Sequence, residues 1–234
     1  MAITKDDLVA AIATAKKSAK KNFVQGVDLV IPLTGLDMKK PEHQVDFFID
    51  LPGGLGRKAK VCALIGADFH QEAKAACDGA VMQEDFPSYG KNRKVARKLA
   101  RQYDFFIGQA NIMPQIATTF GRVLGPKGKM PNPKAGCVVP PKANLKPLIE
   151  RLQRLMHVTA KTVPMGQCKI GNESIADDLL AANAAAVYAQ LLQGLPSGEQ
   201  NVKAVFVKLT MGKPVAVKAG KAAGTEGKKP KHKP

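Results

Sequence analysis

The chain has 234 residues, of which 45% are hydrophobic, and its 36 lysines and arginines outnumber its 19 aspartates and glutamates, a formal net charge of +17. This composition excludes a wholly disordered chain, because it provides enough apolar residues for one large core or two modest ones. The apolar runs are far shorter than the about 18 residues that a membrane-spanning helix needs. Nucleic acid is therefore the leading class of partner.

The scarcity of aromatic residues narrows the kind of nucleic acid. Only 5% of the residues are aromatic and none is tryptophan, which argues against a protein that stacks successive bases of a single strand on aromatic side chains. Structured RNA, recognised through its shape and backbone, fits better. Asp6 and Asp7 stand where a signal peptide would need a basic start before an apolar segment, so we expect a cytoplasmic protein.

The first elements in chain order are a helix and two strands. Thr4 and Asp7 resemble a capping box, and the following apolar residues recur at helical spacing. Residues 23–33 and 45–51 have strand-like patterns, and antiparallel pairing of these two neighbours is the simplest interpretation. The helical stripe consists of Leu8, Ile12, Ala15 and Ala19, and Lys16, Lys17, Lys20 and Lys21 end the helix.

Residues 51–60 interrupt this pattern with one proline and three glycines, the composition of a hinge or domain boundary. Strands and helices then alternate, which predicts parallel strands in a sheet that helices cover on both faces. We predict strands at 61–65, 80–82 and 105–107 and helices at 69–76, 91–102 and 145–156, the last with a stripe of Leu148, Leu152 and Leu155.

From His157 the pattern returns to extended segments, 157–163 and 167–170, followed by a helix over 174–192 and a strand over 202–209. Strand-rich ends around an alternating middle predict an α/β protein of two domains. Residues 1–58 and 157–220 would form a split α+β domain into which residues 59–156 are inserted. Residues 221–234, part of a lysine-rich end with little apolar bulk, should be a disordered basic tail.

The middle of the chain holds the strongest local concentration of positive charge. Residues 120–136 contain four basic residues, four glycines and three prolines without an acid, and between Phe86 and Ile149 the only carboxylate is Asp104, against twelve lysines and arginines. Unpaired cations in this number favour contact with RNA phosphates over a merely solvated helix face. The candidate auxiliary RNA contacts are Arg93, Lys94, Arg97, Lys98, Lys127 and Lys129.

The glycine-rich segments do not match nucleotide-binding motifs. A P-loop ending at Lys129 would need a glycine where Val123 stands and a serine or threonine where Met130 stands, and the glycines of 53–56 lack the third glycine of a dinucleotide fingerprint. Residues 125–128 match the GXXG of KH domains, which clamp single-stranded RNA between two helices, and this alternative stays open. A nucleotide-dependent enzyme using the alternating middle is a further alternative.

The cysteines and histidines give no sign of a metal or catalytic site. No CxxC pair and no histidine at ligand spacing is present, which indicates reduced thiols in cores. The histidines are too scattered to form a cluster by sequence proximity, and no nucleophile elbow occurs. We therefore predict no catalytic residue, no metal and no cofactor. The residues concerned are Cys62, Cys77, Cys137 and Cys168, and His43, His70, His157 and His232.

Four separated segments together resemble the family of the ribosomal large-subunit protein L-one, the stalk protein, in its archaeal or eukaryotic-like form. They are NFVQGVDLVIPL (22–33), LPGGLGRKAKV (51–61), LGPKGKMPNPKAG (124–136) and KLTMGKPV (208–215). They occur in the family's order, and the resemblance covers nearly the whole chain up to Val217. It implies a first domain made from both chain ends, interrupted by a Rossmann-like three-layer α/β domain.

The resemblance also implies a function. Proteins of this family bind a junction in large-subunit rRNA, form a mobile stalk beside the exit site, assist release of deacylated tRNA, and commonly repress translation of their own mRNA. The implied partners are large-subunit rRNA, exit-site tRNA, the chain's own mRNA and other ribosomal components, with no membrane, no enzymatic activity and a monomeric free protein. The alternative is a free regulatory RNA-binding protein that never joins the ribosome.

By the same resemblance, the main RNA surface lies on the first domain, away from the charged segment 120–136. Gly212 would let the backbone approach RNA closely, Thr210 could bond a 2′-hydroxyl or phosphate, and Met211 offers adaptable apolar contact. Gly26 departs from the family, which typically has serine or threonine there. The alternative is that Phe23 is a core residue and 210–212 an ordinary turn. The implied RNA-binding residues are Phe23, Asp28, Gly171, Asn172, Thr210, Met211 and Gly212.

Overall fold

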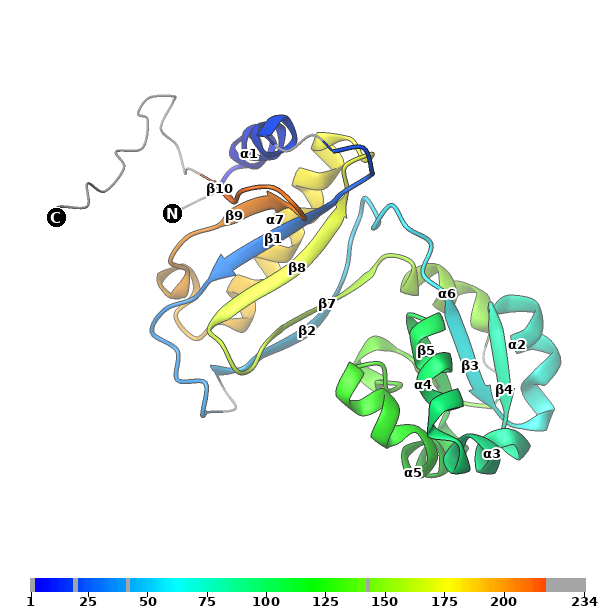
Figure 1. Cartoon of the computed structure of the whole chain (residues 1–234). Helices are drawn as coiled ribbons and strands as arrows, with labels where there is room; N and C mark the ends of the chain where they lie inside the picture. Colours follow the sequence, from blue (N-terminus) through cyan, green and yellow to red (C-terminus); the bar gives the residue numbers. More distant parts are fainter. Residues whose placement is uncertain (1–2, 19–20, 41–42, 142–143, 218–234) are drawn as a thin grey trace, which may run out of the picture.

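The computed structural model describes residues 3–18, 21–40, 43–141 and 144–217, and its helices and strands form two units joined by two chain crossings (Figure 1). We call the unit built from both chain ends the terminal unit and the other the middle unit. The predicted tail, 221–234, and the predicted helix residues Ala19 and Lys20 lie outside the described residues.

The terminal unit contains a four-stranded antiparallel sheet with one helix-covered face. Its order is β10 (Val215–Ala216), β9 (Phe206–Leu209), β1 (Gly26–Pro32), β8 (Met165–Asn172). Helix α7 (Asp177–Gly194) covers one face and α1 (Lys5–Ser18) packs on α7 and on the β9–β10 edge (Figure 1). A separate two-stranded ladder, β2 (Val45–Asp50) with β7 (Leu155–Ala160), continues beside β8.

Alternating burial along β1 explains why this sheet has one covered face. Val27, Leu29 and Ile31 are at most 2% exposed and share one apolar core with Leu180 and Val187 of α7. The predicted pairing of residues 23–33 with 45–51 is wrong, because β1 pairs with β8 and β9 while β2 pairs with β7. β1 has a hydrogen-bonding edge on each side, and the returning chain pairs with both, through β8 and β9.

The start of α1 confirms the predicted capping box. The Thr4 amide and hydroxyl donate to the Asp7 carboxylate at 3.1 and 2.6 Å, and the Asp7 amide lies 3.4 Å from the Thr4 hydroxyl oxygen. These bonds satisfy amide groups that the first helical turn leaves free.

The middle unit is a parallel sheet between two layers of helices, as predicted. Its strand order is β4 (Gly79–Met82), β3 (Val61–Ile65), β5 (Phe105–Gln109), β6 (Val138–Val139). All of β3 is buried. One face packs on α2 (His70–Ala76) and α6 (Leu145–Leu152), and the other on α3 (Phe86–Lys91), α4 (Arg93–Gln102) and α5 (Met113–Leu124).

Short 3-10 helices follow several strands and helices. They are η2 (Ala67–Phe69), η3 (Gln83–Asp85), η4 (Ala110–Ile112), η5 (Gly125–Lys127), η6 (Pro133–Ala135) and η7 (Gly198–Asn201). Residues 120–124 belong to α5, so the turn-rich segment begins only at Gly125. After η5 the chain leads to a turn and not to a second α-helix, so the KH alternative is wrong.

The predicted helix over 145–156 is too long. Helix α6 ends at Leu152, and Leu155 begins β7, where it pairs with Asp50 of β2. Leu148, Leu152 and Leu155 have helical spacing, but Leu155 reaches the same apolar core as Leu152 from a strand. At this point the Gln153 side chain accepts from the Ala59 amide at 2.7 Å and donates to the Ala59 carbonyl at 2.9 Å, which ties the two chain crossings together.

Candidate nucleic-acid interface

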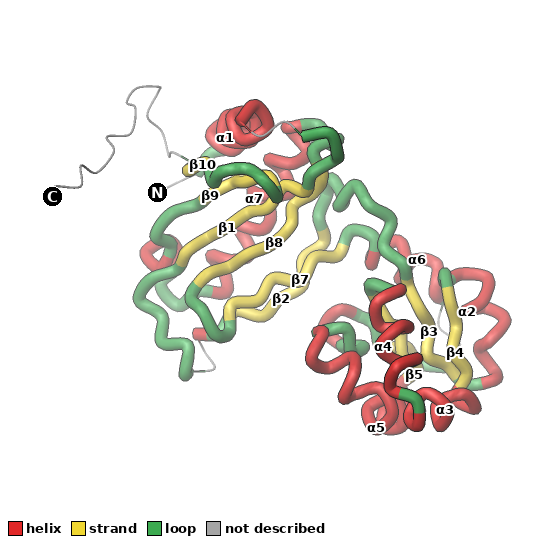
Figure 2. Tube along the Cα trace, viewed as in Figure 1, coloured by secondary structure: helices red, strands yellow, loops and turns green. Residues whose placement is uncertain are grey.

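Antiparallel pairing gathers the predicted RNA-binding residues at one end of the terminal sheet. The start of β1 lies beside the ends of β8 and β9, so residues 21–25, 172–176 and 210–214 meet there, and the glycine loop 52–56 joins them (Figure 2). We call this group of four segments the loop end. Phe23 thus lies at the same end of the sheet as Thr210 and Met211, although it is far from them in the sequence.

The buried Gln25 connects segments of the loop end through hydrogen bonds. Its side chain is buried, with 1% exposed, and its Oε1 accepts from the Met211 amide at 3.1 Å, while its carbonyl accepts from the Glu173 amide at 2.9 Å. The Thr210 amide donates to the Gly26 carbonyl at 3.0 Å. Backbone held in this way presents its outer atoms in one geometry, which a shape-specific RNA contact requires.

Two asparagines brace the glycine loop. Asn183 is fully buried in α7, its Oδ1 accepts from the Gly53 amide at 2.8 Å, and its Nδ2 donates to Gly54 at 3.0 Å and to Ile170 at 2.8 Å. Asn172 donates to the Gly56 carbonyl at 3.1 Å. Sequence reasoning missed Gln25 and Asn183. An asparagine within the apolar run of the helix was a usable signal for Asn183.

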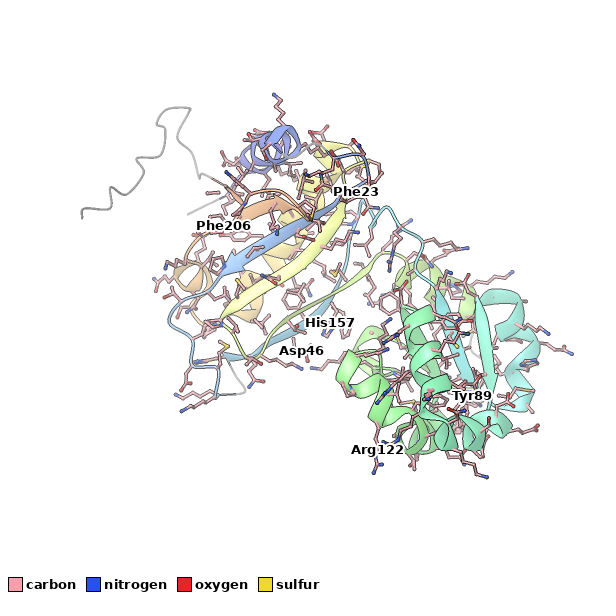
Figure 3. All side chains as sticks on the ribbon, viewed as in Figure 1. Phe23, Asp46, Tyr89, Arg122, His157 and Phe206 are labelled. Atoms are coloured by element: carbon pink, nitrogen blue, oxygen red, sulfur yellow. The ribbon has the colours of Figure 1, made fainter. Side chains whose placement is uncertain are left out.

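The loop end exposes large apolar side chains to solvent. Phe23 is 56% exposed, Val24 66% and Met211 63% (Figure 3 labels Phe23 at this end). The alternative in which Phe23 is a core residue is therefore wrong. Apolar side chains this exposed, on a braced backbone with an exposed Thr210 hydroxyl, form a surface with both stacking and hydrogen-bonding capacity.

Gly171 lies below this surface. It is buried, and a Cβ at this position would meet Leu180 Cδ2 at 2.6 Å and Ile175 Cδ1 at 2.9 Å. The absent side chain therefore makes room for α7, and the contribution of Gly171 to any RNA contact is indirect.

Asp28 lies on the face of the sheet that no described helix covers. Its register partners are Lys169 on β8 and Lys208 on β9, so two lysines flank one carboxylate. A carboxylate is a hydrogen-bond acceptor and repels phosphate, so this part of the open face is chemically distinct from the cations that flank it.

The second predicted surface, on the middle unit, is built differently. Arg93, Lys94, Arg97 and Lys98 are exposed on α4, and none pairs with a carboxylate among the residues that the structure describes. We call these four residues with Lys127 the α4 surface. Although Lys127 is exposed, partial desolvation together with the charges of Arg101, Lys129 and Arg97 lowers the pKa of Lys127, which shows how closely the cations gather.

Lys129, predicted as an RNA contact, has a structural role. Its ammonium donates to the carbonyls of Ala100 at 3.1 Å and Tyr103 at 2.6 Å, at the carboxyl end of α4. It therefore caps the last helical turn, where a cation suits the helix dipole.

The described residues contain no helix long and apolar enough to cross a membrane and no group of three or more potential metal ligands. The four cysteines are free. Burial raises the pKa of the Cys62 and Cys168 thiols to about 12, so both stay protonated at neutral pH.

Together, the split antiparallel sheet, the inserted parallel sheet, the loop end and the basic α4 surface define a two-part α/β protein with a candidate nucleic-acid interface. The model of the Ribosomal protein L1p/L10e family matches residues 15–213, and the chain belongs to this family.

Curated relatives agree with this membership. The chain is 36% identical over 214 residues to the large ribosomal subunit protein uL1 of Methanothermococcus thermolithotrophicus, covering 91% of this chain and 98% of the relative. It is 40% identical over 206 residues to uL1 of Methanococcus voltae, covering 88% and 94%. It is 37% identical over 219 residues to uL1 of Thermococcus kodakarensis, covering 93% and 99%.

Proposed function

We propose that this chain is a structural, non-enzymatic component of the large ribosomal subunit and that it binds large-subunit rRNA through the loop end. Family membership supports the ribosomal role. The observation that carries the choice of surface is the combination of exposed Phe23 and Met211 with a backbone fixed by buried Gln25. Fixed donors and acceptors beside exposed apolar groups suit structured RNA.

Within this proposal, the α4 surface adds affinity without selectivity. Arg93, Lys94, Arg97 and Lys98 lie on one helix and pair with no carboxylate among the described residues, so they can follow phosphates on any RNA. The loop end would supply recognition, because its amide and hydroxyl positions are fixed by hydrogen bonds.

We further propose that the chain forms part of the mobile stalk, assists release of deacylated tRNA, contacts exit-site tRNA and represses its own mRNA. A stalk needs parts that move. The terminal unit, residues 1–58 and 157–220, and the middle unit, 59–156, have separate apolar cores, which supports treating them as domains. Arg57–Asp104 at 2.8 Å and Arg151–Asp50 at 3.1 Å are the ion pairs beside the crossings, and both are partly exposed and weak enough to break.

Sedimentation of cell extract in a sucrose gradient tests the ribosomal role. We expect the chain to migrate with the large subunit and to be released by high salt. If it stays at the top of the gradient while the subunits migrate, the free regulatory alternative holds. Crosslinking to total RNA then tests the partners: large-subunit rRNA, tRNA and the chain's own mRNA are each expected among the bound segments, and the absence of any one removes that partner.

A further inference from the structure

The side chain of Lys169 lies over Gly26, beside the Thr210 hydroxyl. A Cβ placed on Gly26 would meet Lys169 Cε at 3.0 Å, Thr210 Oγ1 at 3.1 Å and Lys169 Nζ at 3.4 Å. Lys169 belongs to β8, Gly26 to β1 and Thr210 follows β9, so three strands bring these groups to one point. None of the three groups was linked to the others by the sequence.

The backbone conformation of Gly26 does not require a glycine, because its φ is not positive. The small space above its Cα does favour one. A Cβ there would make unusually close contacts with the end of the Lys169 side chain and with the Thr210 hydroxyl, so one of these groups would have to shift. Gly26 therefore leaves room for the lysine beside Thr210.

The two polar groups over Gly26 have complementary hydrogen-bonding capacities. The Thr210 hydroxyl donates to the Gly26 carbonyl at 3.2 Å, which leaves its lone pairs directed outward as acceptors. The Lys169 ammonium is a pure donor, and no carboxylate in the described part of the chain lies within ion-pair distance of it. An acceptor beside a cationic donor matches a ribose 2′-hydroxyl next to a phosphate oxygen.

Building on the RNA-binding function proposed above, we propose that Lys169, beside the loop end, is a recognition residue, placed over Gly26 so that its ammonium binds a phosphate oxygen while Thr210 accepts from the adjacent 2′-hydroxyl. Lys208 provides the matched comparison. It flanks Asp28 from β9 on the same open face, but it is not among the three atoms nearest to the Gly26 position.

The test measures binding of the whole chain to in vitro-transcribed large-subunit rRNA of Methanococcus voltae and to a scrambled transcript of equal length. The variants are Lys169→Met, Lys208→Met, Gly26→Ala and the double variant of Gly26 and Lys169. Lys169→Met keeps the aliphatic stem, so the folded state should persist, and thermal unfolding checks this. Gly26→Ala leaves Lys169 in the chain and provides an independent route to the same answer.

We expect Lys169→Met to weaken rRNA binding roughly tenfold, the value for one charge-assisted hydrogen bond. Lys208→Met should lose less than about threefold, as for a screened surface charge. Gly26→Ala should weaken binding in the wild-type background and add nothing in the Lys169→Met background, because both act on the same ammonium.

Three results would overturn the proposal: a Lys169→Met variant that binds like wild type, equal losses for Lys169→Met and Lys208→Met, or an undiminished Gly26→Ala effect without Lys169. The behaviour of the wild-type chain distinguishes failure of the Lys169 proposal from failure of the proposed RNA-recognition function. If wild type prefers rRNA to the scrambled transcript, any of these results removes only the role of Lys169. If wild type binds both equally, the recognition function of the loop end fails, and the role of Lys169 fails with it.

Discussion

The loop end and the α4 surface are both candidate RNA contacts, yet they are built on opposite principles. The α4 surface has the higher density of positive charge, but its side chains are exposed on α4 and η5 and pair with no carboxylate in the described part of the chain. The loop end has less charge, but its segments come from distant parts of the chain and are joined by hydrogen bonds that the Gln25 side chain accepts and the Asn172 and Asn183 side chains donate. Charge density alone would have selected the α4 surface.

The difference shows that attraction and recognition need different structures. Long-range attraction depends on net charge and falls with salt, whereas selectivity depends on fixed donors, acceptors and excluded volume. The two regions should therefore respond differently to shape-changing and charge-changing substitutions.

The largest expected effect comes from changing the shape of the loop end. Gly212→Val and Thr210→Val should each weaken rRNA binding by about 1–3 kcal/mol, through steric exclusion at Gly212 and loss of a hydroxyl acceptor at Thr210. Filter binding at fixed salt measures the change. Thermal unfolding should be nearly unaffected, because Thr210 is exposed and its hydroxyl bond to Gly26 is at the surface.

Lys213→Met removes a charge from the exposed part of the loop end without adding bulk, so it should weaken binding much less than Gly212→Val. If it weakens binding as much as Gly212→Val, charge and not shape governs the loop end, and the contrast between the two regions disappears.

Gly171→Ala should test whether close packing of β8 against α7 stabilises the region beneath the loop end. The new methyl group would meet Leu180 and Ile175 within 2.9 Å, so we expect the free energy of unfolding to fall by about 1–3 kcal/mol, the usual cost of overpacking. Denaturant unfolding measures it. Gly121→Ala, inside α5 with nothing within 4 Å of the new Cβ, should instead stabilise the chain by roughly 0.5–1 kcal/mol. Equal effects at both positions would show that Gly171 has no packing role.

The local features of this fold are readable from the sequence because neighbouring residues determine them. Thr4 and Asp7 reveal the helix start, and the run at 61–65 reveals a buried strand. The positions of Phe23 and Thr210–Gly212 followed from a family resemblance, and the geometry of their neighbourhood agrees with it. Their contact with RNA is a proposal.

Features that depend on distant contacts were not readable. Leu155 has the spacing of a helical residue, but the pairing with Asp50 places it in a strand. In the sequence Lys129 does not differ from the other cations of its segment. Its role depends on the carboxyl end of α4, which the fold places next to it. Gln25 resembles a solvated polar residue in sequence, whereas three-dimensional packing buries it under Met211.

Neutralising the α4 surface should change salt dependence more than selectivity. Replacing Arg93, Lys94, Arg97 and Lys98 with glutamine should lower the log–log salt slope by about 0.7–0.9 for each phosphate that the protein no longer neutralises, and affinity should fall by similar factors for rRNA and scrambled RNA. Affinity measured at several salt concentrations checks this. A variant that loses its preference for rRNA while keeping its salt slope would make the α4 surface the recognition site.

The smallest expected effect concerns the β2–β7 ladder between the two regions, where Asp46 accepts from His157 at 2.6 Å and from Lys161 at 2.8 Å, and the His157 ring stacks on Phe48. These groups line a hollow of about 230 Å³ with Lys129 and Asn132 of the middle unit on its other side. Partial burial opposes ionisation of Asp46, but the hydrogen bonds from Lys161 and His157 outweigh it and hold the pKa of Asp46 below its ordinary value of 3.8.

Because the folded-state pKa of Asp46 is depressed, the stability that its carboxylate contributes is present above the ordinary pKa and is lost as the pH falls through the folded-state value. Asp46→Asn should therefore lower the free energy of unfolding at neutral pH by less than about 1 kcal/mol, as for a partly exposed pair, and flatten its dependence on pH below about 4. Denaturant unfolding from pH 2.5 to 7 follows both changes, with Glu84→Gln as an exposed control. An Asp46→Asn profile that runs parallel to wild type at every pH would mean that these pairs do not stabilise the β2–β7 ladder.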